Sequence, residues 1–229
     1  MSIWERLKKS LAAIARGEPL ARVFERLERA PEHSVAFTIA MIGLGAKMAK
    51  ADGRVTHDEI TAFREIFHIP AGAERQAARV YNLARTDVAG FESYAHQIAR
   101  MFAERPAMRA DLLEGLVYIA AADGEYHPGE AVFLERVAEI FGVDETAFRA
   151  MRARHLPGER DPWQILGVEP GADPDTLRTR YRALVRELHP DQMVARGVPV
   201  EARRLAERRL AAVTAAYAEL RGAATAETG

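Results

Sequence analysis

The sequence predicts an all-α protein, and three observations support that fold class. Ala and Arg, which both favour helix, are abundant. Segments in which apolar and polar residues alternate, as they do in half-buried strands, are missing. Pro and Gly residues divide the chain into pieces of ordinary helix length, so that each piece can begin and end as a separate helix.

The composition is that of a globular protein with no dominant charge. Hydrophobic residues make up 48% of the chain and charged residues 28%, and 229 residues suffice for one large or two modest domains. The formal net charge of -1 gives no argument for binding nucleic acid or an anionic membrane. The chain has no Cys, which excludes disulfides, thiol nucleophiles and cysteine metal sites and fits a reducing compartment.

The first 32 residues form an amphipathic segment rather than a membrane anchor. The longest uncharged run in the chain, about residues 34–46, is shorter than the roughly 20 apolar residues that span a bilayer. Apolar side chains recur at helical spacing over residues 3–16, with basic residues between them. Such a helix either packs on its own domain, which we favour, or lies on a membrane surface. We therefore expect a cytoplasmic protein without a transmembrane segment, with peripheral contact to the inner membrane through residues 3–16 as the alternative.

Residues 33–155 read as a bundle of helices with an internal repeat. The piece at 35–50 is apolar on most sides and is expected at the centre of the bundle, and Gly53 follows it as a left-handed stop. A capping-box pattern at residues 56–59 opens the next helix. The pattern Ala-Asp-Gly-x-(Val or Tyr)-x-x-x-Glu occurs at Asp52 and again 71 residues later at Asp123, which indicates a duplicated helix–turn–helix unit. Further helices are expected at residues 20–28, 58–68, 73–84, 87–102, 106–122, 128–140 and 144–154.

The two acidic turns suggest a possible metal-binding site. Asp52 with Glu59, and Asp123 with Glu130, could offer carboxylates to a divalent cation, although their spacing is not that of an EF-hand loop. The interpretation that we favour assigns the turn to Gly and the helix cap to Glu. In that case no cofactor is needed.

The duplicated segment resembles the TerB-like helical domain. The resemblance rests on Lys50 to Val55 followed by Glu59, and on Ala121 to Tyr126 followed by Glu130, and it covers roughly residues 33 to 154. It implies an all-α bundle and a link to stress responses and membrane-associated complexes.

Residues 156–229 are expected to form a second helical unit, and the linker expected at residues 155–160 leads into it. A short helix follows Asp161, and a longer one runs from Pro174 to Leu188 with a single apolar stripe. The tripeptide His189-Pro190-Asp191 interrupts it, because proline disfavours helix at the residue before it. We expect an exposed turn reaching to about residue 199 and a last helix over residues 200–221. The expected core of the unit is formed by Leu177, Tyr181, Leu184, Leu210, Val213 and Tyr217.

This unit resembles the J domain of DnaJ-like co-chaperones. The matching residues are Trp163 to Val168, Tyr181-Arg182, Leu188 to Asp191, and Ala216-Tyr217 with Leu220. The resemblance implies that the protein binds a DnaK-type chaperone and stimulates its ATP hydrolysis. It assigns the essential contact to His189, Pro190 and Asp191, and a basic docking face to Arg178, Arg182 and Arg186.

A TerB-like domain followed by a C-terminal J domain is similar to the DjlA-like subgroup. In this interpretation the TerB-like part selects a client or a location, and the J domain recruits the chaperone there. No catalytic motif is present, so we predict no enzymatic activity of its own.

Two other functions remain open at this point. The first is nucleic-acid binding through Arg203, Arg204, Arg208 and Arg209, but Glu201 and Glu207 interrupt the stripe, which favours a solvated face and no nucleic-acid partner. The second is an ion-responsive or stress-response binding protein that acts through the duplicated acidic turns.

Overall fold

The computed structural model describes residues 33–51, 90–124 and 126–226, together with a few single positions elsewhere, and all regular secondary structure in these ranges is helical. The predicted all-α class is confirmed for them. The helices expected at residues 20–28, 58–68 and 73–84, the N-terminal segment 3–16 and the first acidic turn lie outside the described ranges.

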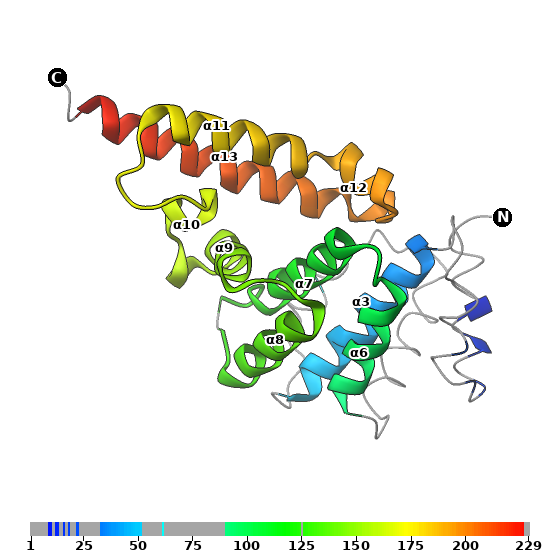
Figure 1. Cartoon of the computed structure of the whole chain (residues 1–229). Helices are drawn as coiled ribbons and strands as arrows, with labels where there is room; N and C mark the ends of the chain where they lie inside the picture. Colours follow the sequence, from blue (N-terminus) through cyan, green and yellow to red (C-terminus); the bar gives the residue numbers. More distant parts are fainter. Residues whose placement is uncertain are drawn as a thin grey trace.

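In the described ranges of the N-terminal part, five helices pack around one apolar core. They are α3 (His33–Ala51), α6 (Phe91–Met101), α7 (Pro106–Ala120), α8 (Pro128–Phe141) and α9 (Glu145–His155). The described side chains of α3 from Val35 to Ala49 are all buried, which confirms its predicted central place. Helix α3 contacts α6, α7 and α8 (Figure 1).

Local signals explain where these helices begin and end. Helix α8 begins at Pro128, whose missing N–H costs nothing in the first turn, and the Glu130 carboxylate accepts a hydrogen bond from the His127 N–H at 3.1 Å. The helix ends at Phe141, and the following Gly142 has a φ of 67°, a left-handed conformation that glycine adopts without the strain of a side chain. Helix α9 begins after Asp144, whose side chain accepts the Ala147 N–H at 2.8 Å.

The C-terminal part consists of two long antiparallel helices with smaller pieces at their ends (Figure 1). The long helices are α11 (Pro174–Glu187) and α13 (Arg203–Ala226); the smaller pieces are η1 (Pro157–Glu159), α10 (Pro162–Leu166), α12 (Pro190–Arg196) and η2 (Val200–Ala202). The rings of Tyr181 and Tyr217 stack between α11 and α13 with their centroids 4.3 Å apart. The six predicted core residues are all buried or packed against the core of this part.

The structure differs from the prediction after the tripeptide. The expected open turn up to residue 199 contains helix α12, which begins at Pro190 and ends at Arg196, and Gly197 after it has a φ of 99°. The last helix proper begins at Arg203 rather than at residue 200. His155, assigned to a linker by its sequence position, ends α9 with only 4% of its side chain exposed.

The two parts share their cores. Met193, Val198, Ala202, Leu205 and Ala206, all from the C-terminal part, are buried in the same apolar cluster as α3 and α7. In the other direction, Ala153 of α9 belongs to the core cluster of the C-terminal part. Helix α9 therefore contributes side chains to both cores, and α10 packs directly on it.

Candidate functional site

The tripeptide lies at the N-terminus of α12, beside the end of α11. His189 is the cap residue: its Nδ1 atom accepts the Asp191 N–H at 3.2 Å, and the other ring nitrogen is directed away from this bond. The side chains of His189 and Asp191 are 50% and 81% exposed, whereas Pro190 is buried beneath them. The tripeptide thus offers an imidazole and a carboxylate to a partner while the proline anchors the backbone.

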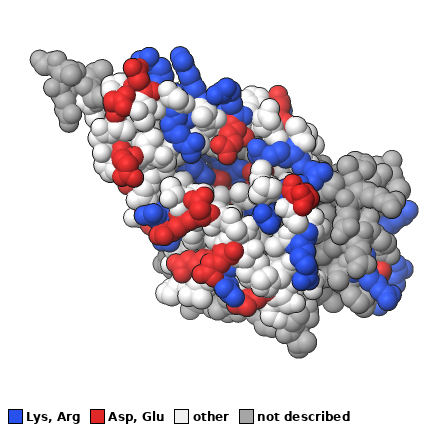
Figure 2. Space-filling view, in the orientation of Figure 1, with Lys and Arg blue, Asp and Glu red and all other residues white. Residues whose placement is uncertain are grey.

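The three arginines predicted to form a basic face lie four residues apart on α11, and all are exposed. Arg178 pairs with Asp175 at 3.3 Å, and the Arg186 Nε atom donates to the Arg182 carbonyl oxygen at 3.4 Å. Along the edge of the molecule that α11 occupies, Figure 2 shows Lys and Arg side chains with Asp and Glu among them. Exposed charges such as these steer a partner and set its orientation more than they add affinity.

Another arginine of α11 holds the small helix in place. The Arg180 Nε atom donates to the Leu166 carbonyl oxygen at 2.9 Å, which binds the end of α10 to α11. The Asp173 carboxylate accepts the N–H groups of Asp175 and Thr176 at 3.0 Å each and so begins α11, and the hydrogen bonds from Thr176 hold the pKa of Asp173 below its usual value. The basic face is therefore presented on a helix that is fixed at its start.

Of the four predicted metal ligands, the structure describes two. Glu130 is 1% exposed, and its carboxylate is engaged in the cap of α8, which is the role that we favoured from sequence. Within the part of the chain that the structure describes, no group of three or more His, Cys, Asp or Glu side chains is arranged to hold a metal ion. Asp52 and Glu59 lie outside that part, so a cation at the paired turns stays a prediction, to be tested by titration with calcium or magnesium.

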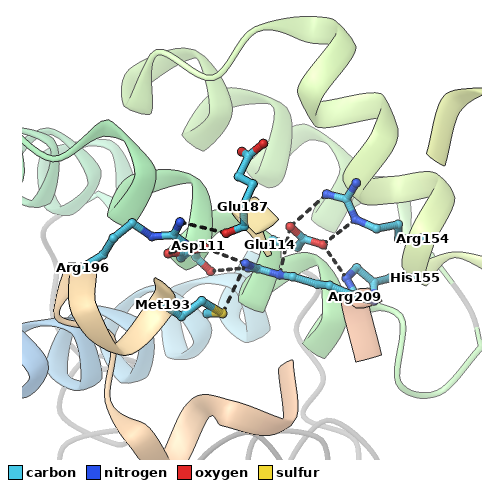
Figure 3. A network of polar contacts seen from close by, with 8 residues as sticks. All are labelled: Asp111, Glu114, Arg154, His155, Glu187, Met193, Arg196 and Arg209. Atoms are coloured by element: carbon cyan, nitrogen blue, oxygen red, sulfur yellow. Dashed lines mark hydrogen bonds and ion pairs between the residues drawn. The ribbon is translucent and has the colours of Figure 1, made fainter. Parts of the chain in front are cut away.

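The structure also contains a buried ionic network that the sequence did not indicate. It consists of Asp111 and Glu114 on α7, Arg154 and His155 at the end of α9, Arg196 on α12 and Arg209 on α13 (Figure 3). Three guanidinium groups thus face two carboxylates. The network joins the N-terminal part of the chain to the C-terminal part.

Arg209 occupies the centre of this network. Its side chain is 1% exposed; Nη1 donates to Asp111 Oδ1 at 2.6 Å, Nη2 donates to the Asp111 carbonyl oxygen at 3.2 Å, and Nε lies 3.0 Å from Glu114 Oε2. The prediction that its arginine stripe is a solvated face is therefore wrong for Arg209. Arg208 is exposed but lies over the Tyr118 ring, 4.9 Å from its centroid, whereas Arg203 and Arg204 are exposed as predicted.

Glu114 is held in its charged form by its neighbours. Burial alone would raise the pKa of this carboxyl, but Arg154 and Arg209 hold the pKa well below its usual value. Arg154 binds it through two hydrogen bonds of 2.7 and 2.9 Å. Burial lowers the pKa of His155, despite the 3.0 Å contact of its Nε2 atom with Glu114.

The length and hydropathy of the helices give one further observation. Among the helices in the described ranges, none is both long enough and apolar enough to cross a bilayer.

An exposed imidazole–proline–carboxylate turn beside a basic helix, in a helical unit attached to a larger helical bundle, defines a J-domain protein with an additional domain. The family described as DnaJ domain matches residues 161–225, and the family described as tellurite resistance protein TerB matches residues 38–153, just over half of the chain.

Curated relatives named as co-chaperones match this chain over most of their length. The proteins named co-chaperone protein DjlA from Coxiella burnetii and from Aliivibrio fischeri are 27% and 26% identical to this chain, over 76% and 81% of it and 72% and 78% of their own lengths. The protein of the same name from Escherichia coli K12 is 26% identical over 81% of this chain and 79% of its own length. No solved structure gives a significant match. The chain belongs to the DjlA-like co-chaperones, with a TerB domain followed by a C-terminal J domain.

Proposed function

We propose that this co-chaperone binds a DnaK-type chaperone through its J domain and stimulates the ATP hydrolysis of that chaperone. The observation that carries the proposal is the exposure of His189 and Asp191 at the start of α12, next to a helix whose three arginines are also exposed. Asp191 can accept a bidentate hydrogen bond from an arginine of the partner, and the arginines of α11 complement an acidic surface.

The TerB domain supplies the part of the function that differs among J-domain proteins. It selects a client or a location, while the J domain recruits the chaperone there. The relatives named co-chaperone protein DjlA align with this chain over 76% and 81% of its length, across both matched domains, which supports one function for the two together. We place this activity in the cytoplasm, in keeping with a sequence that has no Cys.

The proposal is tested by the steady-state ATPase rate of a DnaK-type chaperone with and without the full chain. We expect stimulation by the wild type and its loss in His189→Gln, because glutamine changes the shape and the donor geometry at the exposed cap. His96→Gln is the matched control, since His96 is exposed on α6 of the TerB domain and should leave stimulation unchanged. Stimulation that survives His189→Gln would contradict the assigned contact.

A further inference from the structure

The surface of the TerB domain that α7 provides is covered by the J domain. Leu205 and Ala206, in the first turns of α13, are fully buried in the TerB core cluster, and Met193 of α12 lies in the same cluster with 2% exposure. A side chain at Gly115 of α7 would meet the Met41 Cε atom at 2.4 Å and the Leu205 Cδ2 atom at 3.6 Å. The glycine therefore lets α3, α7 and α13 approach closely at one point.

Polar contacts at the same surface set the register of the two domains. Asp111 and Glu114 are three residues apart on α7, so both carboxylates face the J domain from neighbouring positions of the helix surface. Asp111 contacts two arginines of the J domain, Arg196 at 3.1 Å and Arg209 at 2.6 Å. Glu114 joins Arg209 to the end of α9 (Figure 3). These buried charges fix the relative position of the two domains. A displaced arginine would lose its hydrogen bonds to the carboxylates, and water could not reach the site to replace them.

Arg196 connects this surface to the tripeptide. Its Nη2 atom donates to Asp111 of the TerB domain, and its Nη1 atom donates at 3.1 Å to the carbonyl oxygen of Glu187, two residues before His189. From the other side, the Arg105 Nη1 atom of the TerB domain donates at 3.2 Å to the carbonyl oxygen of Arg196, at the C-terminus of α12. The helix that carries the tripeptide at its start is therefore bound to the TerB domain at its end.

The contact leaves the proposed chaperone-binding groups accessible. His189 and Asp191 are exposed while α12 is docked, and so are Arg178, Arg182 and Arg186 of α11. The docked arrangement is thus compatible with chaperone binding, and the TerB domain does not cover the tripeptide.

We propose that α7 of the TerB domain is a positioning surface for the J domain, which binds Arg196 and Arg209 and thereby holds α12 and its tripeptide in the arrangement that a chaperone recognises. Arg196 and Arg209 are positioning residues that act through α12 and need not touch the chaperone. This inference rests on the proposed function, because it assigns the docking a role in chaperone binding. If the docking is lost, α12 must be ordered again at each encounter, so the apparent affinity falls in proportion to the docked fraction, while maximal stimulation is kept.

The first arm of the test measures hydrogen exchange of the amides of residues 191–198 and 200–202 in the full chain, without any partner. We expect Arg196→Met and Arg209→Met to speed this exchange by about tenfold or more, the factor that corresponds to losing a hydrogen bond to a charged group. Arg203→Met is the matched control: Arg203 is exposed on α13 and pairs with Glu207 on the same helix. If Arg209→Met does not fold, Arg196→Met remains informative, since Arg196 lies at the edge of the network with 23% of its side chain exposed.

The second arm measures stimulation of a DnaK-type ATPase as a function of the concentration of the chain. Arg196→Met should raise the half-maximal concentration about tenfold and reach the same maximum. His189→Gln should lose the maximum; it removes the cap on the Asp191 N–H but should leave the exchange at residues 194–198, the end of α12 that is bound to the TerB domain, unchanged. Arg203→Met should alter neither quantity.

Three outcomes would overturn the inference or its basis. Wild-type exchange rates at residues 190–196 in both Arg196→Met and Arg209→Met would show that these residues do not hold α12. Faster exchange with an unchanged half-maximal concentration would show that docking does not position the tripeptide. A wild type that protects α12 but stimulates no DnaK-type ATPase would refute the proposed function, and with it the role assigned to the docking.

Discussion

Arg209 shows how far a charged side chain depends on partners that are remote in sequence. It is 98 residues away from Asp111, yet it is 1% exposed, and two carboxylates of α7 compensate for its lost hydration. Burying a single ion without partners costs several kcal/mol of stability. Removing one partner of a buried ion pair destabilises the folded protein by about 3–5 kcal/mol. Its surroundings therefore make Arg209 a fixed point between the two domains and not a surface residue.

At the scale of single residues, the buried ionic network around Glu114 predicts that the stability of the protein depends on pH. Burial lowers the pKa of His155 below its ordinary value of 6.5, with Glu114 of α7, Arg154 of α9 and Arg209 of α13 as the charged groups facing it. The unfolded chain takes up a proton below about pH 6.5, whereas the folded chain does not, so the free energy of unfolding falls as the pH falls. The lowered pKa of Glu114 acts in the same direction below its ordinary value of 4.5.

We therefore expect the free energy of unfolding to decrease between pH 7 and pH 5, and to decrease less in His155→Gln, which can still donate to Glu114 but does not titrate. Denaturant titrations at several pH values measure both slopes. His96→Gln, at an exposed position on α6, should keep the wild-type slope. A slope in His155→Gln equal to that of the wild type would show that another group causes the pH dependence.

At the scale of single elements, α12 depends on how it ends. The Gly197 N–H donates to the Val194 carbonyl oxygen at 2.9 Å, and the Val198 N–H donates to the Met193 carbonyl oxygen at 3.0 Å. These two bonds form a Schellman ending, which needs a residue with positive φ after the helix; Gly197 has a φ of 99°. The ending directs Val198 into the TerB core, where it is 2% exposed.

Gly197→Ala should consequently loosen the contact between α12 and the TerB domain. A side chain in this backbone conformation costs about 1–2 kcal/mol, and the chain can avoid that cost by unwinding the end of α12. We expect faster hydrogen exchange at residues 190–198 and a slightly lower melting temperature. Gly171→Ala is the control, because Gly171 has a φ of 82° before α11 and open space around it. It should lower the melting temperature similarly without altering exchange in α12, and equal exchange in the two variants would argue against this role of Gly197.

The same helix marks the limit of what the sequence could predict. The helical class, the central place of α3 and the exposure of His189, Asp191 and the α11 arginines follow from composition, periodicity and motifs. Helix α12 was not predicted because its seven residues, of which the first is a proline, are too few to show a period. The arginine stripe on α13 resembles a solvated face, and only the tertiary contact with Asp111 and Glu114 reveals that Arg209 is buried.

On the scale of the whole molecule, the two domains form one structure rather than two units on a linker. Ala153 of the TerB domain lies in the J-domain core, and Leu205 of the J domain lies in the TerB core. Helix α9 contacts α7, α10 and α13, so it belongs to both domains at once. Shared cores of this kind couple the stabilities of the domains, because neither can unfold without exposing apolar surface of the other.

This coupling predicts cooperative unfolding of the described part of the chain. Differential scanning calorimetry of the wild type should give one transition with a calorimetric enthalpy close to the van't Hoff enthalpy, as for a two-state protein. Arg209→Met should broaden this transition or begin to separate it into two, because the substitution removes the central polar contact between the domains and leaves Arg196 and the shared apolar cores to couple them. The substitution still leaves Asp111 paired with Arg196 and Glu114 paired with Arg154, so neither carboxylate is left as a lone buried charge.

Arg203→Met is the control for the calorimetry, and two transitions in the wild type would be the contrary result. Arg203→Met removes an exposed arginine from the same helix and should keep a single transition at nearly the wild-type temperature, since an exposed pair within one helix contributes at most about 0.5 kcal/mol. Two transitions in the wild type, with residues 161–225 melting separately, would mean that the shared cores and the buried ionic network contribute too little to couple the domains. In that case the TerB domain could not hold the tripeptide of the J domain, because a contact too weak to unite their unfolding is also too weak to restrict α12 in the folded state.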